Sequence, residues 1–261
     1  MNILRARLLS ISALLALAAC RQTAPPAAVD PGAAACLTPD TVAVAVADLV
    51  RLRASPFVNS LGGSARDFLE QHQSASQALV AWDTRGFLIV ERGTFPQAPP
   101  GARLLEPGLA VSGSAAGILS ALAQHRSGST GAPGLIEYGS AFGARSALWL
   151  AIRGGTALPL SGNLANLNLL LQHADFAGLA LDLGAAATLR FSARGHSVPS
   201  ARQLEERLRG LLSLAGEAEV RRPGLARLIG AARIERSGAD VTAVLVAPAD
   251  AVASLLAGFG H

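Results

Sequence analysis

The residues that could carry out chemistry are few, and their spacings match no established catalytic or metal-binding pattern. The histidines form no His-x-x-x-His pair, and there is neither a His-Glu-x-x-His motif nor a cysteine cluster, so the sequence predicts no metal site. His173-Ala174-Asp175 could hold a histidine–carboxylate pair, but adjacent side chains at a helix end more often point apart. We expect His173 at a helix C-terminus, where its charge would suit the helix dipole.

The sequence gives equally little support for nucleophilic or acid–base catalysis. The sequence has no Gly-x-Ser-x-Gly, and Ser114, in the run Gly113-Ser114-Ala115-Ala116-Gly117, is expected to be the N-cap of the following helix. Asp67 and Glu70 lie one helical turn apart on a face that we interpret as solvated. The chain contains no lysine, which excludes a GK[ST] P-loop, a Ser-x-x-Lys site and a Schiff base. We therefore predict no catalytic residue, no cofactor and no enzyme activity.

Arginine is concentrated toward the C-terminus, where a candidate anion site lies. Residues 202–236 contain eight arginines and five glutamates. Arg221 and Arg222 precede Pro223 in a predicted exposed loop, where guanidinium forks could contact phosphate headgroups or an anionic glycan. The alternative, a solvated helix surface of mixed charge, is favoured. With a net charge of +4 and 4% aromatic residues, the chain is predicted to bind no nucleic acid and to offer no stacking platform.

The first 20 residues indicate where the protein is located. Arg5 and Arg7 precede an apolar run, Leu8–Ala19, that is too short for a membrane-spanning helix, which needs about 20 residues. This is the pattern of a secretory signal. Its end, Leu17-Ala18-Ala19-Cys20, resembles the lipobox of bacterial lipoproteins. The resemblance implies cleavage before Cys20 and acylation of its thiol and new amino group, so that the membrane is a partner through the lipid anchor.

The resemblance also implies a destination. Residue 21 is Arg rather than the Asp of the inner-membrane retention pattern, which favours the outer membrane with the domain facing the periplasm. In the alternative, an ordinary signal peptidase would leave Cys20 free to pair with Cys36, closing a loop of about 15 residues that contributes about 3 kcal/mol. If Cys20 is acylated, Cys36 is an odd thiol, which we interpret as a small buried apolar residue.

The elements of the first half follow an Ala/Pro-rich segment. We predict that residues 20–40 are an unstructured tether, after the signal peptide of residues 1–19. The alternation of Val42–Val46 predicts a strand with Val facing the core, and a helix is expected over Ser64–Gln73. Ala78–Asp83 and Phe87–Arg92 read as a β-hairpin around Thr84-Arg85-Gly86. Trp82 and Trp149 fall within apolar strands and are expected in the core. Asp48–Pro56 resembles the opening of secreted proteins from GC-rich bacteria, a resemblance that implies no activity.

The second half repeats this pattern. Val198–Gly216 is the clearest amphipathic helix, strands follow at Ala232–Arg236 and Val241–Val246, and Pro248 opens a terminal helix. We predict an α+β fold of two related lobes, each an antiparallel or mixed sheet covered by helices on one face. The first lobe would span residues 41–160 and the second residues 161–261.

Two functions remain open at this point. The first is a non-catalytic envelope accessory domain that binds another envelope protein, indicated by the tether and by the lack of a catalytic constellation. The second is a carrier or sensor that holds a lipid or apolar small molecule between the two lobes. The 51% hydrophobic composition and the alanine-lined first strand would suit such a ligand.

Overall fold

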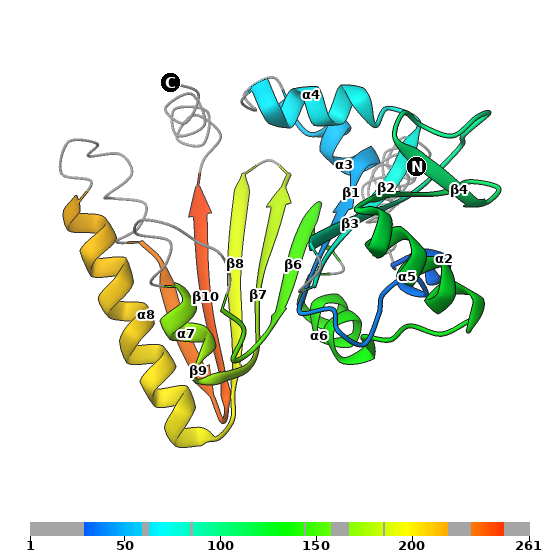
Figure 1. Cartoon of the computed structure of the whole chain (residues 1–261). Coiled ribbons are helices and arrows are strands. Elements are labelled where there is room, and N and C mark those ends of the chain that lie inside the picture. The colour runs from blue at the N-terminus through cyan, green and yellow to red at the C-terminus, as the bar shows by residue number, and fades with distance from the viewer. Residues whose placement is uncertain are drawn as a thin grey trace, which may run out of the picture.

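The computed structural model describes residues 29–58, 63–83, 86–143, 145–157, 167–184, 186–218 and 231–247. Ten strands form one continuous sheet in the order β4-β5-β3-β2-β1-β6-β7-β8-β10-β9, and all neighbouring strands are antiparallel (Figure 1). The strands are β1 Ala43–Asp48, β2 Ala75–Asp83, β3 Gly86–Gly93, β4 Ala102–Glu106, β5 Leu109–Gly113, β6 Leu148–Arg153, β7 Ala174–Leu183, β8 Ala187–Gly195, β9 Arg233–Ser237 and β10 Asp240–Ala247.

Helices pack on both faces of this sheet. They are α2 Pro31–Ala34, α3 Leu49–Ala54, α4 Gly63–Gln71, α5 Ala115–Arg126, α6 Pro133–Gly143, α7 Leu167–Leu171 and α8 Val198–Ala218. The predicted α+β class is therefore confirmed, and of the antiparallel or mixed sheet that was predicted the antiparallel form is found. The prediction that helices cover one face is wrong, because the described helices pack on both. The two predicted lobes are not seen as separate sheets, because β6 and β7 pair directly across residue 160.

The strand order contains an internal repeat. Read outward from the central pair, the first half runs β1-β2-β3-β5-β4 and the second half runs β6-β7-β8-β10-β9. Because β1 and β6 pair antiparallel, a two-fold axis normal to the sheet between them relates the two orders. In strand order, β6 therefore belongs with the second half.

One face of the sheet, which we call the first face, carries Val44 and Val46 and forms the larger core in the first half. Leu79, Val90 and Trp149 lie on the same face and are all nearly inaccessible. Helices α2, α5 and α6 cover it. Two glycines of α6 admit the Trp149 ring, since a Cβ added at Gly139 or Gly143 would lie 2.1 Å or 2.5 Å from atoms of that side chain.

The second face carries Ala43, Ala45 and Ala47, and two separate groups of helices cover parts of it. Helices α7 and α8 pack over the second half, around Leu204 and Val241. Helices α3 and α4 pack over Ala47 and the neighbouring strands. In Figure 1, α7 and α8 lie toward one side of the molecule and α3 and α4 toward the other, and no described helix crosses the upper parts of β6, β7 and β8 in this view.

The predicted tether extends too far. Residues from Asp30 onward belong to the folded domain, because Asp30 caps α2 by accepting a hydrogen bond from the Ala33 N–H at 2.9 Å. Cys36 and Leu37 are fully buried in the core of the first face. The segment escapes a search for apolar periodicity because its packing residues are mostly alanines, whose small side chains lie close against the sheet.

Candidate functional site

The residues predicted for acylation and anion binding, Cys20, Arg221 and Arg222, lie outside the described residues, as does the helix predicted after Pro248. Ser114 is confirmed as an N-cap, since its Oγ accepts a hydrogen bond from the Gly117 N–H at 3.1 Å.

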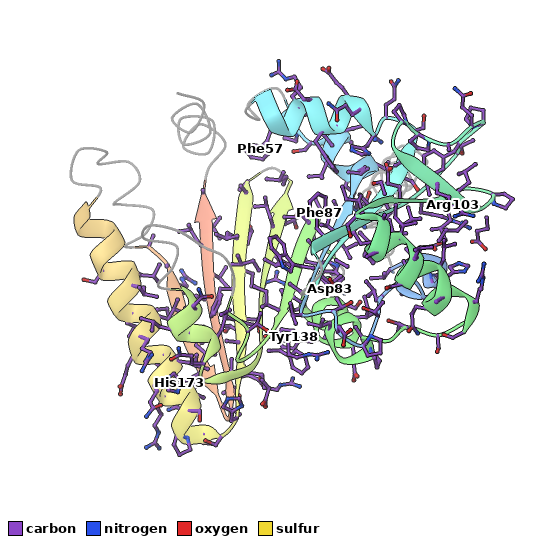
Figure 2. All side chains as sticks on the ribbon, viewed as in Figure 1. Phe57, Asp83, Phe87, Arg103, Tyr138 and His173 are labelled. Carbon is purple, nitrogen blue, oxygen red and sulfur yellow. The ribbon has the colours of Figure 1, made fainter. Side chains whose placement is uncertain are left out.

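The histidine–carboxylate pair near His173 forms with a different histidine. Asp175 Oδ1 lies 2.6 Å from Nδ1 of His196, the residue that follows β8, and the hydrogen bond raises the pKa of His196 above its ordinary value. His173 lies two residues beyond the end of α7, toward the α8 side of the molecule in Figure 2. Since both partners are half-exposed, this contact joins the ends of β7 and β8 and forms no enclosed site. The sequence could not predict this pairing, because the two residues are 21 positions apart and meet only when the β7–β8 hairpin forms.

Cys36 is a buried, unreactive thiol. Its Sγ contacts the Gly32 carbonyl oxygen at 3.4 Å. Burial, followed by the negative charges of Glu106 and Asp30, raises its pKa to about 12. Because nucleophilic attack needs the thiolate, this residue is structural at physiological pH.

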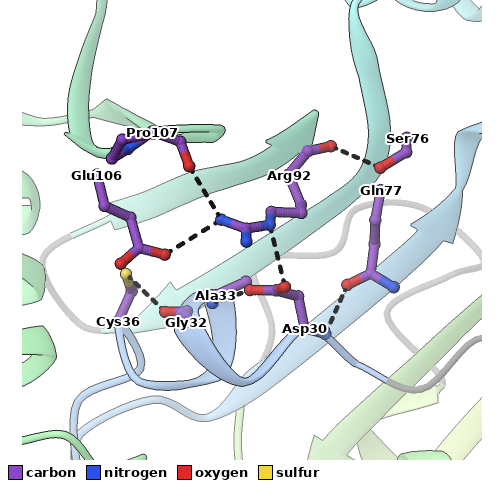
Figure 3. Close-up of polar contacts among 9 residues, drawn as sticks. All are labelled: Asp30, Gly32, Ala33, Cys36, Ser76, Gln77, Arg92, Glu106 and Pro107. Carbon is purple, nitrogen blue, oxygen red and sulfur yellow. Dashed lines mark hydrogen bonds and ion pairs between the residues drawn. The ribbon is translucent and has the colours of Figure 1, made fainter. Parts of the chain in front are cut away.

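A polar network fixes the first described residues to the sheet (Figure 3). Arg92 on β3 joins two carboxylates, with Nε 3.2 Å from Asp30 Oδ2 and a terminal nitrogen 3.1 Å from Glu106 Oε1. The Asp30 N–H donates to the Gln77 side chain at 2.9 Å. The first described residues therefore lie beside Gln77 and Arg92, at one end of the β2–β3 hairpin.

Beside this network lies an open groove of about 360 Å³ whose lining includes Arg53 and Arg92. Both guanidinium groups already have partners, because Arg53 donates to the carbonyl oxygens of His72 and Ala75 and Arg92 pairs with carboxylates. Because these guanidinium groups are bonded to carbonyl and carboxylate oxygens of the protein, the groove is a poor candidate for an anion site. A smaller hollow, beside Cys36, has a volume of about 10 Å³, room for one water molecule at most.

The second face of the sheet is apolar across its whole middle. From β3 to β10 the pairing registers place on it, beside one another, Phe87, Ile89, Ala78, Val80, Trp82, Ala43, Ala45, Ala47, Leu148, Leu150, Ile152, Ala177, Leu179, Leu181, Leu183, Ala187, Leu189, Phe191, Ala193, Val241, Ala243, Leu245 and Ala247. Glu91, at the end of β3 near α4, is the charged exception. Most soluble sheets that leave part of a face to solvent alternate apolar with polar residues.

One line of directly opposed residues on this face is only partly buried, and we call it the apolar row. It consists of Ile89, Val80, Ala45, Leu150, Leu179 and Phe191, each the register partner of the next. To one side of Ala45, Ala43 is buried in the core that includes α7 and α8. To the other side, Ala47 is buried in the core that includes α3 and α4. At β1 the row therefore lies between the two cores, whereas Leu150 and Phe191 pack against the core that includes α7 and α8.

An exposed aromatic pair lies beside one end of this row. Trp82 and Phe87 are cross-strand partners near the turn of the β2–β3 hairpin, 40% and 53% exposed, and Figure 2 labels Phe87 near the middle of the molecule. The expectation that both tryptophans lie in the core is thus confirmed for Trp149 and wrong for Trp82. Strand periodicity predicted the apolar character of this position but could not tell which face the helices would cover.

Neither a metal site nor a membrane-spanning helix is found in the ranges of the chain that the structure describes. Within those ranges no three His, Cys, Asp or Glu side chains gather in a way that could hold a metal ion. No helix there is long and apolar enough to cross a membrane.

Comparisons with known proteins give only distant likeness. No protein-family model and no curated protein matches the chain. Among solved structures it is similar to crystal form I of TP0453, with 12% identity and a TM-score of 0.47 over 89% of this chain and 98% of that one. For crystal form III of TP0453 the values are 14%, 0.49, 89% and 99%.

Proposed function

We propose that this chain is a lipid-anchored protein of the cell envelope, held at the outer membrane through Cys20 and facing the periplasm. Its domain would act by binding an envelope partner rather than by catalysis. The lipobox resemblance supports the anchor. Support for binding comes from the exposed aromatic pair, Trp82 and Phe87, which is the observation that carries the proposal.

Large aromatic side chains are the residues that most often dominate the energy of protein interfaces. Trp82 and Phe87 face the same side of adjacent strands and expose a substantial part of their surface. Exposed aromatic pairs of this kind offer a large apolar contact with little side-chain entropy to lose.

The pair lies away from the first described residues. The Asp30 N–H donates to Gln77, five residues before Trp82 along β2, which corresponds to about 17 Å of strand. A partner bound to the aromatic pair would therefore not compete with the contacts that hold Asp30.

Site-specific photocrosslinking in living cells tests this proposal. A photoreactive phenylalanine analogue would replace Phe87 in the full, acylated chain, and a matched chain would carry it at Leu119, which is 65% exposed on α5. We expect one discrete crosslinked product from position 87 that disappears when Trp82→Ser is added. Products of the same size and yield from both positions, or none from position 87, would contradict a partner at the aromatic pair.

A further inference from the structure

We propose that the C-terminal segment, residues 248–261, docks as an amphipathic helix on the second face of the sheet, over β6, β7, β8 and β10. The segment follows Ala247, the last described residue. This inference goes beyond the proposed function, which rests on Trp82 and Phe87 of β2 and β3. The two proposals rest on different residues and can fail separately.

The receiving surface lies on the part of the second face that the helices leave open. In Figure 1 no described helix crosses the upper parts of β6, β7 and β8. Six apolar residues occupy the second face from this area to the middle of the same strands, two on each strand, and none of them is buried. We call them the leucine patch, which consists of Leu148, Leu150, Leu179, Leu181, Leu189 and Phe191.

The leucine patch is wide enough to receive a helix. Its residues form two rows across the strands, because positions two apart on one strand, such as Leu148 and Leu150, point to the same face. The rows are about 7 Å apart, and an α-helix with its side chains is about 10 Å across. Described elements pack against the edges of the patch, as Leu150 and Phe191 do against the core that includes α7 and α8, yet Leu189 is 38% exposed.

The C-terminal segment has the sequence of a helix with one apolar face. The i, i+3, i+4, i+7 spacing that marks such a face is followed by Val252, Leu255, Leu256 and Phe259. Asp250 and Ser254 fall on the opposite side of the same helix. Pro248 stands at the start, where proline is favoured in the first helical turn. The helix therefore needs an apolar surface to cover one face and water to reach the other.

The segment begins beside the leucine patch. Leu245 on β10 is the register partner of Leu189, and only Val246 and Ala247 separate it from Pro248. The helix can therefore start over β10 without a connecting loop. Residues 248–259 would span about 18 Å as a helix. The three strand spacings from β10 to β6 amount to about 14 Å, so the segment is long enough to cross all four strands.

The first face is a poorer surface for this helix. Val246 lies on that face at the end of β10 and is 55% exposed. Its register partner on β8 is Thr188, and the next residue of β8 on the same face is Arg190. Covering these two side chains with an apolar helix face would remove polar groups from water, which is unfavourable without new hydrogen bonds. The leucine patch has no polar side chain to cover.

A second copy of the chain is a poorer occupant of the patch. A standard interface buries about 800 Å² of each partner. A large apolar side chain has about 200 Å² of surface, and no residue of the patch is more exposed than Leu189, at 38%. The six side chains together therefore offer about 450 Å² at most. That area suits one short helix that is already attached to the domain.

Cysteine labelling in the full chain tests the proposal. Cys20→Ser removes the anchor thiol, and Cys36 is buried. One chain then carries Leu256→Cys, on the apolar face of the helix, and a matched chain carries Ser254→Cys, on the opposite face. We expect a maleimide reagent to label Leu256→Cys about tenfold more slowly than Ser254→Cys. Adding Leu189→Glu should abolish this difference, whereas Leu119→Glu, at an exposed position on α5, should preserve it.

Three results would overturn the proposal. They are equal labelling of the two cysteines, slow labelling of Leu256→Cys that Leu189→Glu leaves unchanged, and protection that is lost on dilution, which would mean that a second copy covers the segment. Should Leu189→Glu lose its native circular dichroism spectrum, Leu189→Ser makes the same test. Crosslinking at Phe87 in a Leu189→Glu chain separates the two proposals, since it should persist whether or not the segment docks.

Discussion

The two halves of the sheet have the same strand order and bury opposite faces. In the first half the main core lies on the first face, where α2, α5 and α6 cover Val44, Leu79 and Trp149. In the second half the main core lies on the second face, where α7 and α8 cover Ala193 and Val241. There the first face instead carries polar side chains such as Arg190 and Arg194.

This difference explains why the apolar row exists. A strand that is buried on one face needs apolar residues only there, but β1 and β6 stand where the buried face changes. Both of their faces are therefore apolar, as in strands covered on two sides. Helices reach the ends of the second face from the two halves, and the middle of that face, around Ala45 and Leu150, is left partly exposed.

The largest expected effect contrasts the two tryptophans. Trp149→Ala removes a fully buried ring from the first-face core and should lower the free energy of unfolding by about 3–5 kcal/mol. Trp82→Ala, at a position that is 40% exposed, should lower it by about 1 kcal/mol or less. Urea denaturation followed by circular dichroism measures both. Equal losses would show that the second face is as well covered as the first.

A smaller effect is expected from the buried pair beneath α4. His72 Nδ1 lies 2.6 Å from the Glu91 carboxylate, which is almost inaccessible, and the Phe68 ring packs against His72. His72→Ala would leave that carboxylate buried without its histidine partner and should lower stability by about 2 kcal/mol. Adding Glu91→Gln should recover part of the loss in the same urea experiment. If the double variant is no more stable than His72→Ala, the loss comes from packing against Phe68.

The network at the root of the tether should contribute less. Arg92→Ala removes ion pairs to Asp30 and Glu106 that are partly exposed, and should lower stability by about 1 kcal/mol. It should also make the chain more susceptible to limited proteolysis near Val29. Arg103→Ala, at an exposed position on β4, is the control and should change neither property. Unchanged cleavage in Arg92→Ala would mean that packing of Cys36 and Leu37 alone holds this segment.

The smallest effect concerns the exposed pair His196–Asp175. Because the hydrogen bond from Asp175 raises the pKa of His196 in the folded protein, it stabilises the fold below the unfolded pKa of about 6.5. That contribution is lost as the pH rises through the raised folded value. Asp175→Asn should therefore lower the melting temperature slightly at pH 5 and not at pH 9. An equal difference at both pH values would show that the charge on His196 plays no part.

Sequence reasoning located most of the elements but not their partners. The hairpin of β2 and β3, the long helix α8 and the N-cap at Ser114 were predicted from alternation, amphipathic spacing and capping chemistry, all local signals. Helix α6 and strand β4 were not predicted. In α6 the glycines that break a helical pattern are needed to admit Trp149, which lies on a strand beyond it in sequence.

The sequence by itself determined the secretory signal pattern, the absence of lysine chemistry, the α+β class and the apolar alternation of the strands, since each depends on residues close together in the chain. Only the tertiary structure decided which face of each strand is covered, that Trp82 is exposed, that Asp175 pairs with His196, and that six apolar residues from six strands form one row. A strand pattern separates two faces but carries no information on which helices will pack against them. That choice is made by long-range contacts between segments far apart in the chain, such as α6 and β1.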